Sequence, residues 1–119
     1  MKKLFLSILS LTAFVLAAQA QIKAEKTVKV STPTVQCDMC KTAIETVLNR
    51  YDGVKSVNVN VKKKEVTVKY LTDRTNEEII KAGIANAGYD ANEIAANPDV
   101  YKTLPKCCKK PEDRAPKKQ

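Results

Sequence analysis

Apolar and polar residues alternate in three short stretches of the chain, a pattern typical of strands that bury one face. The first stretch lies within residues 27–32, and the other two flank the run Lys62-Lys63-Lys64. The alternating apolar residues are Val28 and Val30; Val57, Val59 and Val61; and Val66, Val68 and Tyr70. We therefore predict three strands, of which the last two form a hairpin that turns at the lysine run.

Two other stretches place apolar residues on one face of a helix, and both use the same offsets of 0, 1, 4, 5 and 8. Asp52-Gly53 ends the first predicted helix, and Gly88 suits the left-handed residue after the second. Thr75 followed by Glu78 indicates a capping box, with Thr75 as the predicted N-cap of the second helix. The two stripes are Ala43, Ile44, Val47, Leu48 and Tyr51, and Ile79, Ile80, Gly83, Ile84 and Ala87.

Residues 89–94 can supply a short fourth strand, which completes the order β-α-β-β-α-β as a duplicated unit. Right-handed crossovers joined through the hairpin then give an α+β, ferredoxin-like sandwich. Its four-stranded antiparallel sheet would carry both helices on one face. Because valines and isoleucines of these elements supply the core, we expect the domain to fold without a metal ion.

The N-terminal residues 1–20 have the pattern of a cleavable secretory signal. Lys2-Lys3 precedes an apolar run over residues 4–18, and Ala18-Gln19-Ala20 forms a small-x-small triplet. The apolar run is shorter than the roughly 20 residues that span a bilayer, which argues against the alternative of an uncleaved membrane anchor. We predict a signal peptide over 1–20 and an exported protein, periplasmic or secreted.

The rest of the chain divides into one domain over residues 21–94 and a C-terminal extension over 95–119. In the extension, Asn97 followed by Pro98 is typical of a helix start, and the charged end is predicted to be disordered from about Pro111. The net charge is +8, but the basic residues are mostly scattered among acidic ones, and no tryptophan is present to stack on bases. We therefore expect no nucleic-acid partner and read the charge as a solvated surface, open to acidic partners or anionic membrane.

Cys37 and Cys40 are the main candidate functional residues, because they lie where a strand gives way to a helix. Unpaired N–H groups and the positive dipole end at a helix start favour a thiolate and lower its pKa. Two adjacent thiolates suit either a soft cation or redox exchange. The chain has no histidine, which removes the commonest general base and the usual nitrogen ligand of zinc.

These features together resemble the heavy-metal-associated domain over roughly residues 27–94. The family includes copper chaperones, metal-binding domains of heavy-metal-transporting P-type ATPases and the periplasmic mercury-binding protein, and export makes the last the nearest kind of relative. The matching elements are Cys37-x-x-Cys40 after a strand, the Gly53-Val54 turn, the Val66-x-Val68 strand and Gly88-Tyr89-Asp90-Ala91.

The resemblance implies that Cys37 and Cys40 bind a soft ion and pass it on by ligand exchange, a carrier function rather than an enzymatic one. It places Tyr89 where the family has an aromatic or basic side chain under the metal loop. The family usually has Gly-Met ahead of the first cysteine, whereas this chain has Thr34-Val35. We expect Val35 to replace the methionine as an apolar plug.

The cysteine count limits which ion the site suits. Two thiolates without histidine suit the linear or trigonal coordination of Cu(I) or Hg(II). Zn(II) prefers four ligands and becomes possible only if Cys107 and Cys108 join, and an iron–sulfur cluster also needs four cysteines. We predict Cys37 and Cys40 as metal ligands, with Cys107 and Cys108 as possible auxiliary ligands or disulfide partners. The expected partners are the ion and a membrane metal transporter or another metal-binding protein, and the expected state is a monomer.

Several alternatives remain open at this stage. Cys37 and Cys40 could form an ordinary disulfide, or act as a thiol-disulfide oxidoreductase in which Cys37 attacks and Cys40 resolves. The strand order differs from that of a thioredoxin-like fold, which argues against the second alternative. A sensor or interaction module for a transporter is compatible with the carrier function. For Cys107 and Cys108 to reach the first pair, residues 95–106 must run back along the domain, which their length permits but does not require.

Overall fold

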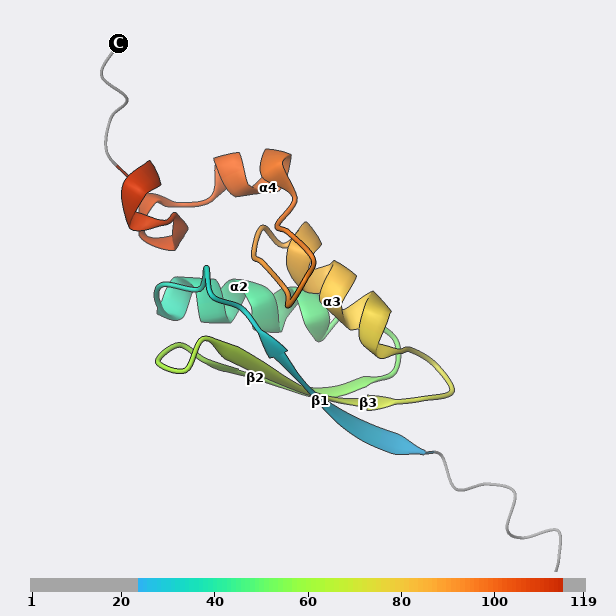
Figure 1. Cartoon of the computed structure of the whole chain (residues 1–119). Helices are drawn as coiled ribbons and strands as arrows, with labels where there is room; N and C mark the ends of the chain where they lie inside the picture. Colours follow the sequence, from blue (N-terminus) through green and yellow to red (C-terminus); the bar gives the residue numbers. More distant parts are fainter. Residues whose placement is uncertain (1–23, 115–119) are drawn as a thin grey trace, which may run out of the picture.

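The computed structural model describes residues 24–114, and the predicted signal peptide over 1–20 lies outside this range. The first strand is followed by a helix, and the next two strands are followed by a second helix, which is the predicted order (Figure 1). Short helical segments make up the extension. None of the helices in the described part is long and apolar enough to cross a membrane. The elements are β1 (Glu25–Ser31), α2 (Asp38–Leu48), β2 (Val54–Asn60), β3 (Glu65–Leu71), α3 (Glu77–Asn86), α4 (Pro98–Thr103), η2 (Lys106–Cys108) and η3 (Pro111–Asp113).

The strands form an antiparallel sheet in the order β1-β3-β2, so β3 lies in the centre. Val30 and Val59 both pair with Val66, which aligns the buried faces of the three strands. The helices α2 and α3 cover the same face of this sheet (Figure 1). The predicted strands and hairpin are thus confirmed, although β2 ends at Asn60 and Val61 lies in the turn.

The predicted fourth strand over residues 89–94 is wrong, because the sheet of the described residues has three strands. Asn92 has a positive φ of 52°, so the chain turns back on itself and makes a single isolated bridge between Ala91 and Ile94. Asn92 still fastens this turn to β1. Its N–H donates to the carbonyl of Ser31 (2.9 Å), and its Oδ1 accepts from the N–H of Ser31 (2.8 Å).

The start of α3 differs from the predicted capping box by one residue. Asn76 is the N-cap, and its Oδ1 accepts from the N–H of Ile79 at 2.9 Å. Thr75 instead belongs to the preceding turn, where its N–H donates to the carbonyl of Leu71. Its hydroxyl is buried without a hydrogen-bond partner among the described residues. Two adjacent residues with capping side chains made the sequence signal ambiguous, and the turn geometry decided between them.

The core lies between the sheet and the two helices, as the apolar pattern predicts. Ile44, Leu48, Ile80 and Ile84 are fully buried against the strand valines. Val47 and Val57, which the pattern also assigns to the core, are only half-buried. The structure does not test whether this core folds without a metal ion, so folding without metal stays a prediction.

The extension runs back over the domain towards the start of α2 (Figure 1). As predicted, Asn97 caps α4, since its Oδ1 accepts from the N–H of Asp99 at 3.0 Å. The side chain of Leu104 packs over Gly88, whose φ of +99° and close approach to Leu104 both suit glycine. Pro111–Asp113, where disorder is predicted to begin, forms a short helical turn.

Candidate metal centre

The loop between β1 and α2 sets the positions of the first two cysteines. Cys37 is the N-cap of α2 in an extended conformation, and its carbonyl accepts from the N–H groups of Cys40 (3.1 Å) and Lys41 (3.2 Å). Cys40 follows in the first helical turn, so the two sulfurs lie on the same side, 3.4 Å apart. Cys40 is fully buried and Cys37 is partly exposed. The pair therefore has one anchored thiol and one accessible thiol.

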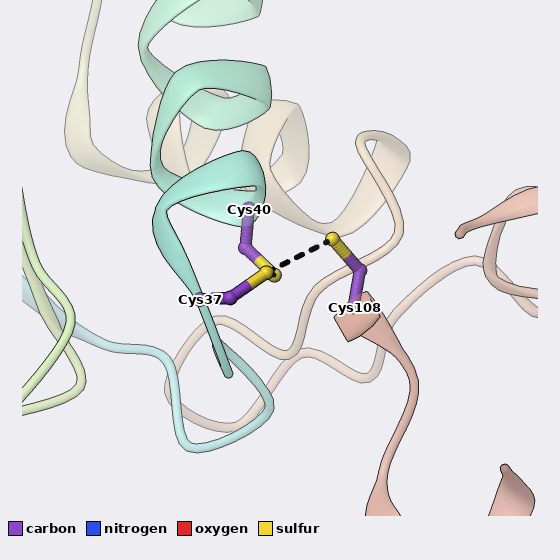
Figure 2. Close-up of side chains that lie close together, drawn as sticks. All are labelled: Cys37, Cys40 and Cys108. Atoms are coloured by element: carbon purple, nitrogen blue, oxygen red, sulfur yellow. Dashed lines mark hydrogen bonds between the residues drawn. The ribbon is translucent and has the colours of Figure 1, made fainter. Parts of the chain in front are cut away.

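A third sulfur from the extension joins this pair. The Sγ of Cys108 lies 3.8 Å from the Sγ of Cys37, and the side chains of Cys37, Cys40 and Cys108 point towards one another (Figure 2). All three sulfurs lie within 4.8 Å of one another. Only 1% of Cys108 is exposed. The return path that the sequence left open therefore exists in the structure.

Cys107 does not belong to the three-sulfur cluster of Cys37, Cys40 and Cys108. Its Sγ lies 4.0 Å from that of Cys108 and 3.4 Å from the Sδ of Met39. Met39, in the first turn of α2, is 57% exposed. The vicinal cysteines thus face different surroundings, and all four thiols are free.

The thiols of the cluster also differ in acidity. The pKa of Cys37 is lowered to about 7: burial, the largest single influence, acts in the opposite direction, but the backbone N–H of Cys40 and the thiols of Cys107 and Cys40 outweigh it. Burial, followed by the neighbouring thiol of Cys40, raises the pKa of Cys108 far above its ordinary range. Near pH 7 Cys37 is therefore about half thiolate, whereas Cys108 stays protonated.

Residues on both sides of the loop support the cluster. Val35 is fully buried, as expected of an apolar plug. The Oγ1 of Thr34 accepts from the N–H of Asp90 at 2.9 Å, which joins the loop between β1 and α2 to the segment after α3. Tyr89 is fully buried, and its hydroxyl has no hydrogen-bond partner among the described residues. Burial and the nearby thiol of Cys108 raise the pKa of this hydroxyl. The sequence predicted the roles of Val35 and Tyr89. It showed only that Thr34 replaces a glycine of the family and did not predict its hydrogen bond to Asp90.

A sandwich of this order with a sulfur cluster at the start of its first helix is the architecture of a small metal-binding domain. The model of the heavy-metal-associated domain matches residues 27–90, more than half of the chain, and the protein belongs to that family. The match ends before the extension, so Cys107 and Cys108 lie outside it.

Two curated relatives illustrate the range of the family. The chain is 32% identical over 79 residues to the mercuric transport protein periplasmic component of Shewanella putrefaciens, covering 66% of this chain and 87% of that protein. It is 33% identical over 76 residues to a copper-exporting P-type ATPase of Staphylococcus aureus (strain Newman), covering 64% of this chain. The match spans only 10% of the length of that ATPase.

Solved structures give the same result. The CopZ metallochaperone superimposes with a TM-score of 0.54 at 32% identity, covering 56% of this chain and 98% of CopZ. Oxidized MerP from Ralstonia metallidurans CH34 superimposes with a TM-score of 0.56 at 25% identity, covering 58% of this chain and 96% of MerP. The protein is thus a metal-binding domain related to both, with further residues that neither of them covers.

Proposed function

We propose that this protein is an exported carrier or scavenger of a soft metal ion, Cu(I) or Hg(II), bound by the thiolates of Cys37 and Cys40. The observation that carries the proposal is the pair of sulfurs 3.4 Å apart at the start of α2, in a chain without histidine. Thiolate ligands select soft ions, whereas hard cations prefer oxygen ligands. The names of the relatives, which include copper and mercury proteins, support the same class of ion.

Release to a partner follows from the unequal exposure of the two cysteines. Cys40 is buried, so an incoming thiolate reaches the ion from the side of Cys37. The ion then passes to the partner as one metal–sulfur bond forms and another breaks, without any change in oxidation state. We infer that the partner is a membrane metal transporter or another metal-binding protein, met by a monomer of this chain.

Export rests on the signal pattern of residues 1–20 and on the periplasmic relative. In this proposal the signal is cleaved and the domain works in the periplasm or outside the cell. Expression of the full chain in a Gram-negative host, followed by fractionation and mass spectrometry of the N-terminus, tests the localisation. A protein that keeps Met1 and stays in the cytoplasm would contradict export, and one that keeps Met1 and stays with the membrane would contradict cleavage.

The metal-binding proposal is tested by titrating the reduced protein with Cu(I), without oxygen, against a competing chelator. One equivalent is expected to bind to the wild-type protein, and the double variant Cys37→Ser, Cys40→Ser is expected to lose this binding. Thr42→Ser, which alters an exposed residue of the same helix, is the matched control and should behave like the wild type. Unchanged binding by the double variant would refute the proposal.

A thiol-disulfide oxidoreductase is the second candidate, and the lowered pKa of Cys37 is the observation that favours it. In this function the Cys37 thiolate attacks a substrate disulfide and Cys40 releases the mixed disulfide. A Cys40→Ser variant should then accumulate mixed disulfides with a model disulfide substrate. If the wild-type protein binds metal but does not turn over the disulfide substrate, the oxidoreductase function is excluded and the carrier function remains.

A further inference from the structure

The sulfurs of Cys40 and Cys108 both lie closer to the sulfur of Cys37 than a linear two-coordinate ion requires. With a metal–sulfur bond of about 2.3 Å, as for Zn–S, a linear centre needs its sulfurs about 4.6 Å apart and a trigonal centre about 4.0 Å apart. The distances from Cys37 are 3.4 Å to Cys40 and 3.8 Å to Cys108. Both distances are closer to the trigonal value than to the linear one, and the third sulfur pair, Cys40 and Cys108, lies within 4.8 Å.

Cys108 is held at this position by the fold of the extension. Its N–H donates to the carbonyl of Pro105 at 2.9 Å, which closes the turn η2. The hydroxyl of Tyr101 accepts from the N–H of Lys110 (2.9 Å) and donates to Asp113 (2.7 Å), so it joins α4 to the residues after Cys108. A terminal segment that is bonded on both sides of a buried cysteine positions that sulfur with little freedom.

The segment after Cys108 is tied down by a charged side chain as well. Arg114 donates through Nη2 to the carbonyl of Cys107 at 3.1 Å and through Nε to the carbonyl of Lys109 at 2.9 Å. These bonds brace the backbone on both sides of Cys108. The neighbouring Cys107, in contrast, points to Met39, so the vicinal pair provides one inward sulfur and one outward sulfur.

We propose that Cys108 is the third ligand of the carried ion, so that the extension converts the two-sulfur site of the family into a three-sulfur site. The inference rests on the proposed metal-carrier function and deepens it. The site then suits soft ions that accept trigonal thiolate coordination, such as Cu(I) and Hg(II). The third bond slows loss of the ion to solvent, and it must break when a partner thiolate takes the ion.

The test is X-ray absorption of the Cu(I)-loaded protein, combined with affinity measured by chelator competition. The wild-type protein should show three sulfur ligands, and Cys108→Ser should show two. The affinity of Cys108→Ser should fall at least about ten-fold, which corresponds to about 1.4 kcal/mol. Cys107→Ser, which changes the adjacent thiol, is the matched control for ligand number, and it should keep three sulfur ligands.

The possible failures are distinguishable. Cys108→Ser and Cys107→Ser with the same sulfur number and affinity would overturn the third ligand and leave the carrier function intact. Unchanged binding by Cys37→Ser, Cys40→Ser would overturn the carrier function itself. Because a buried serine hydroxyl can disturb the extension, Cys108→Ala is measured in parallel. Three sulfur ligands in Cys108→Ala would equally overturn the inference.

Discussion

Replacement of Leu104 by alanine should loosen the extension without unfolding the domain. The Leu104 side chain packs over Gly88 and joins the edge of the core. Truncating a fully buried leucine costs about 2–5 kcal/mol. Since Leu104 is half-buried, we expect a loss of about 1–2 kcal/mol, which lowers the ratio of docked to undocked extension about 5–30-fold.

Native-state hydrogen exchange of the metal-free protein measures this change directly. The amide of Cys108, which donates to Pro105, and the amide of Lys110, which donates to Tyr101, should exchange faster by the same factor. Amides in the middle of α3 should keep the wild-type rate, because the domain core is untouched. Lys102→Ala, which alters an exposed side chain of α4, is the matched control.

Adding Cu(I) should restore slow exchange in Leu104→Ala if Cys108 binds the ion, because ligation favours the docked form. Equal exchange rates in Leu104→Ala and Lys102→Ala, without metal, would refute the reasoning. The docking energy would then reside in another contact, such as the hydrogen bond from the N–H of Asn97 to the carbonyl of Ala85.

Three further changes test other parts of the structure. Gly83→Ala gains about 1 kcal/mol of helix propensity, but the new Cβ would lie 2.7 Å from a ring carbon of Tyr51. Because overpacking costs about 1–3 kcal/mol, the melting temperature should fall, and a rise would contradict the close contact between the helices. Asn76→Ala removes the cap of α3 and should cost about 1 kcal/mol in urea unfolding, and an unchanged midpoint would show that the cap contributes nothing. Alkylation of Cys37 should reach half its maximal rate near pH 7, since its lowered pKa keeps the thiolate present down to that pH, while Cys108 stays unreactive. A Cys37 midpoint near the value of about 8.5 for a free thiol would contradict the assignment.

The sequence predicted the parts of the fold that local periodicity determines. The strands, both helices and most of the core follow from side-chain alternation and helical spacing, and the cap of α4 from Asn97-Pro98. The prediction of a fourth strand over residues 89–94 was wrong because a segment this short has no polar-apolar pattern that separates a strand from a turn. The positive φ of Asn92, which decides the matter, depends on its bonds to Ser31 at the end of β1.

The part of the candidate site that depends on local sequence was predictable, and the part that depends on tertiary packing was not. Cys37 and Cys40 are close in the sequence, so their spacing and the helix start bring their sulfurs together. Cys107 and Cys108 gave no such signal, because their position depends on how the whole extension packs. Which of the two faces inward is decided by the turn η2 and the contact between Leu104 and Gly88, and neither can be read from a vicinal pair.

The sulfur contact between Cys37 and Cys108 joins residues 71 positions apart in the chain. If one ion binds both, it closes a loop that contains most of the domain. The entropy lost by an unfolded chain on closing a loop of this length corresponds to about 4 kcal/mol, by the same account that is used for disulfides. The ion would then act as a reversible crosslink, and the loaded protein should have a higher free energy of unfolding and resist proteases better than the empty one. Delivery of the ion would reopen the loop, so that the empty carrier is also the form most readily degraded.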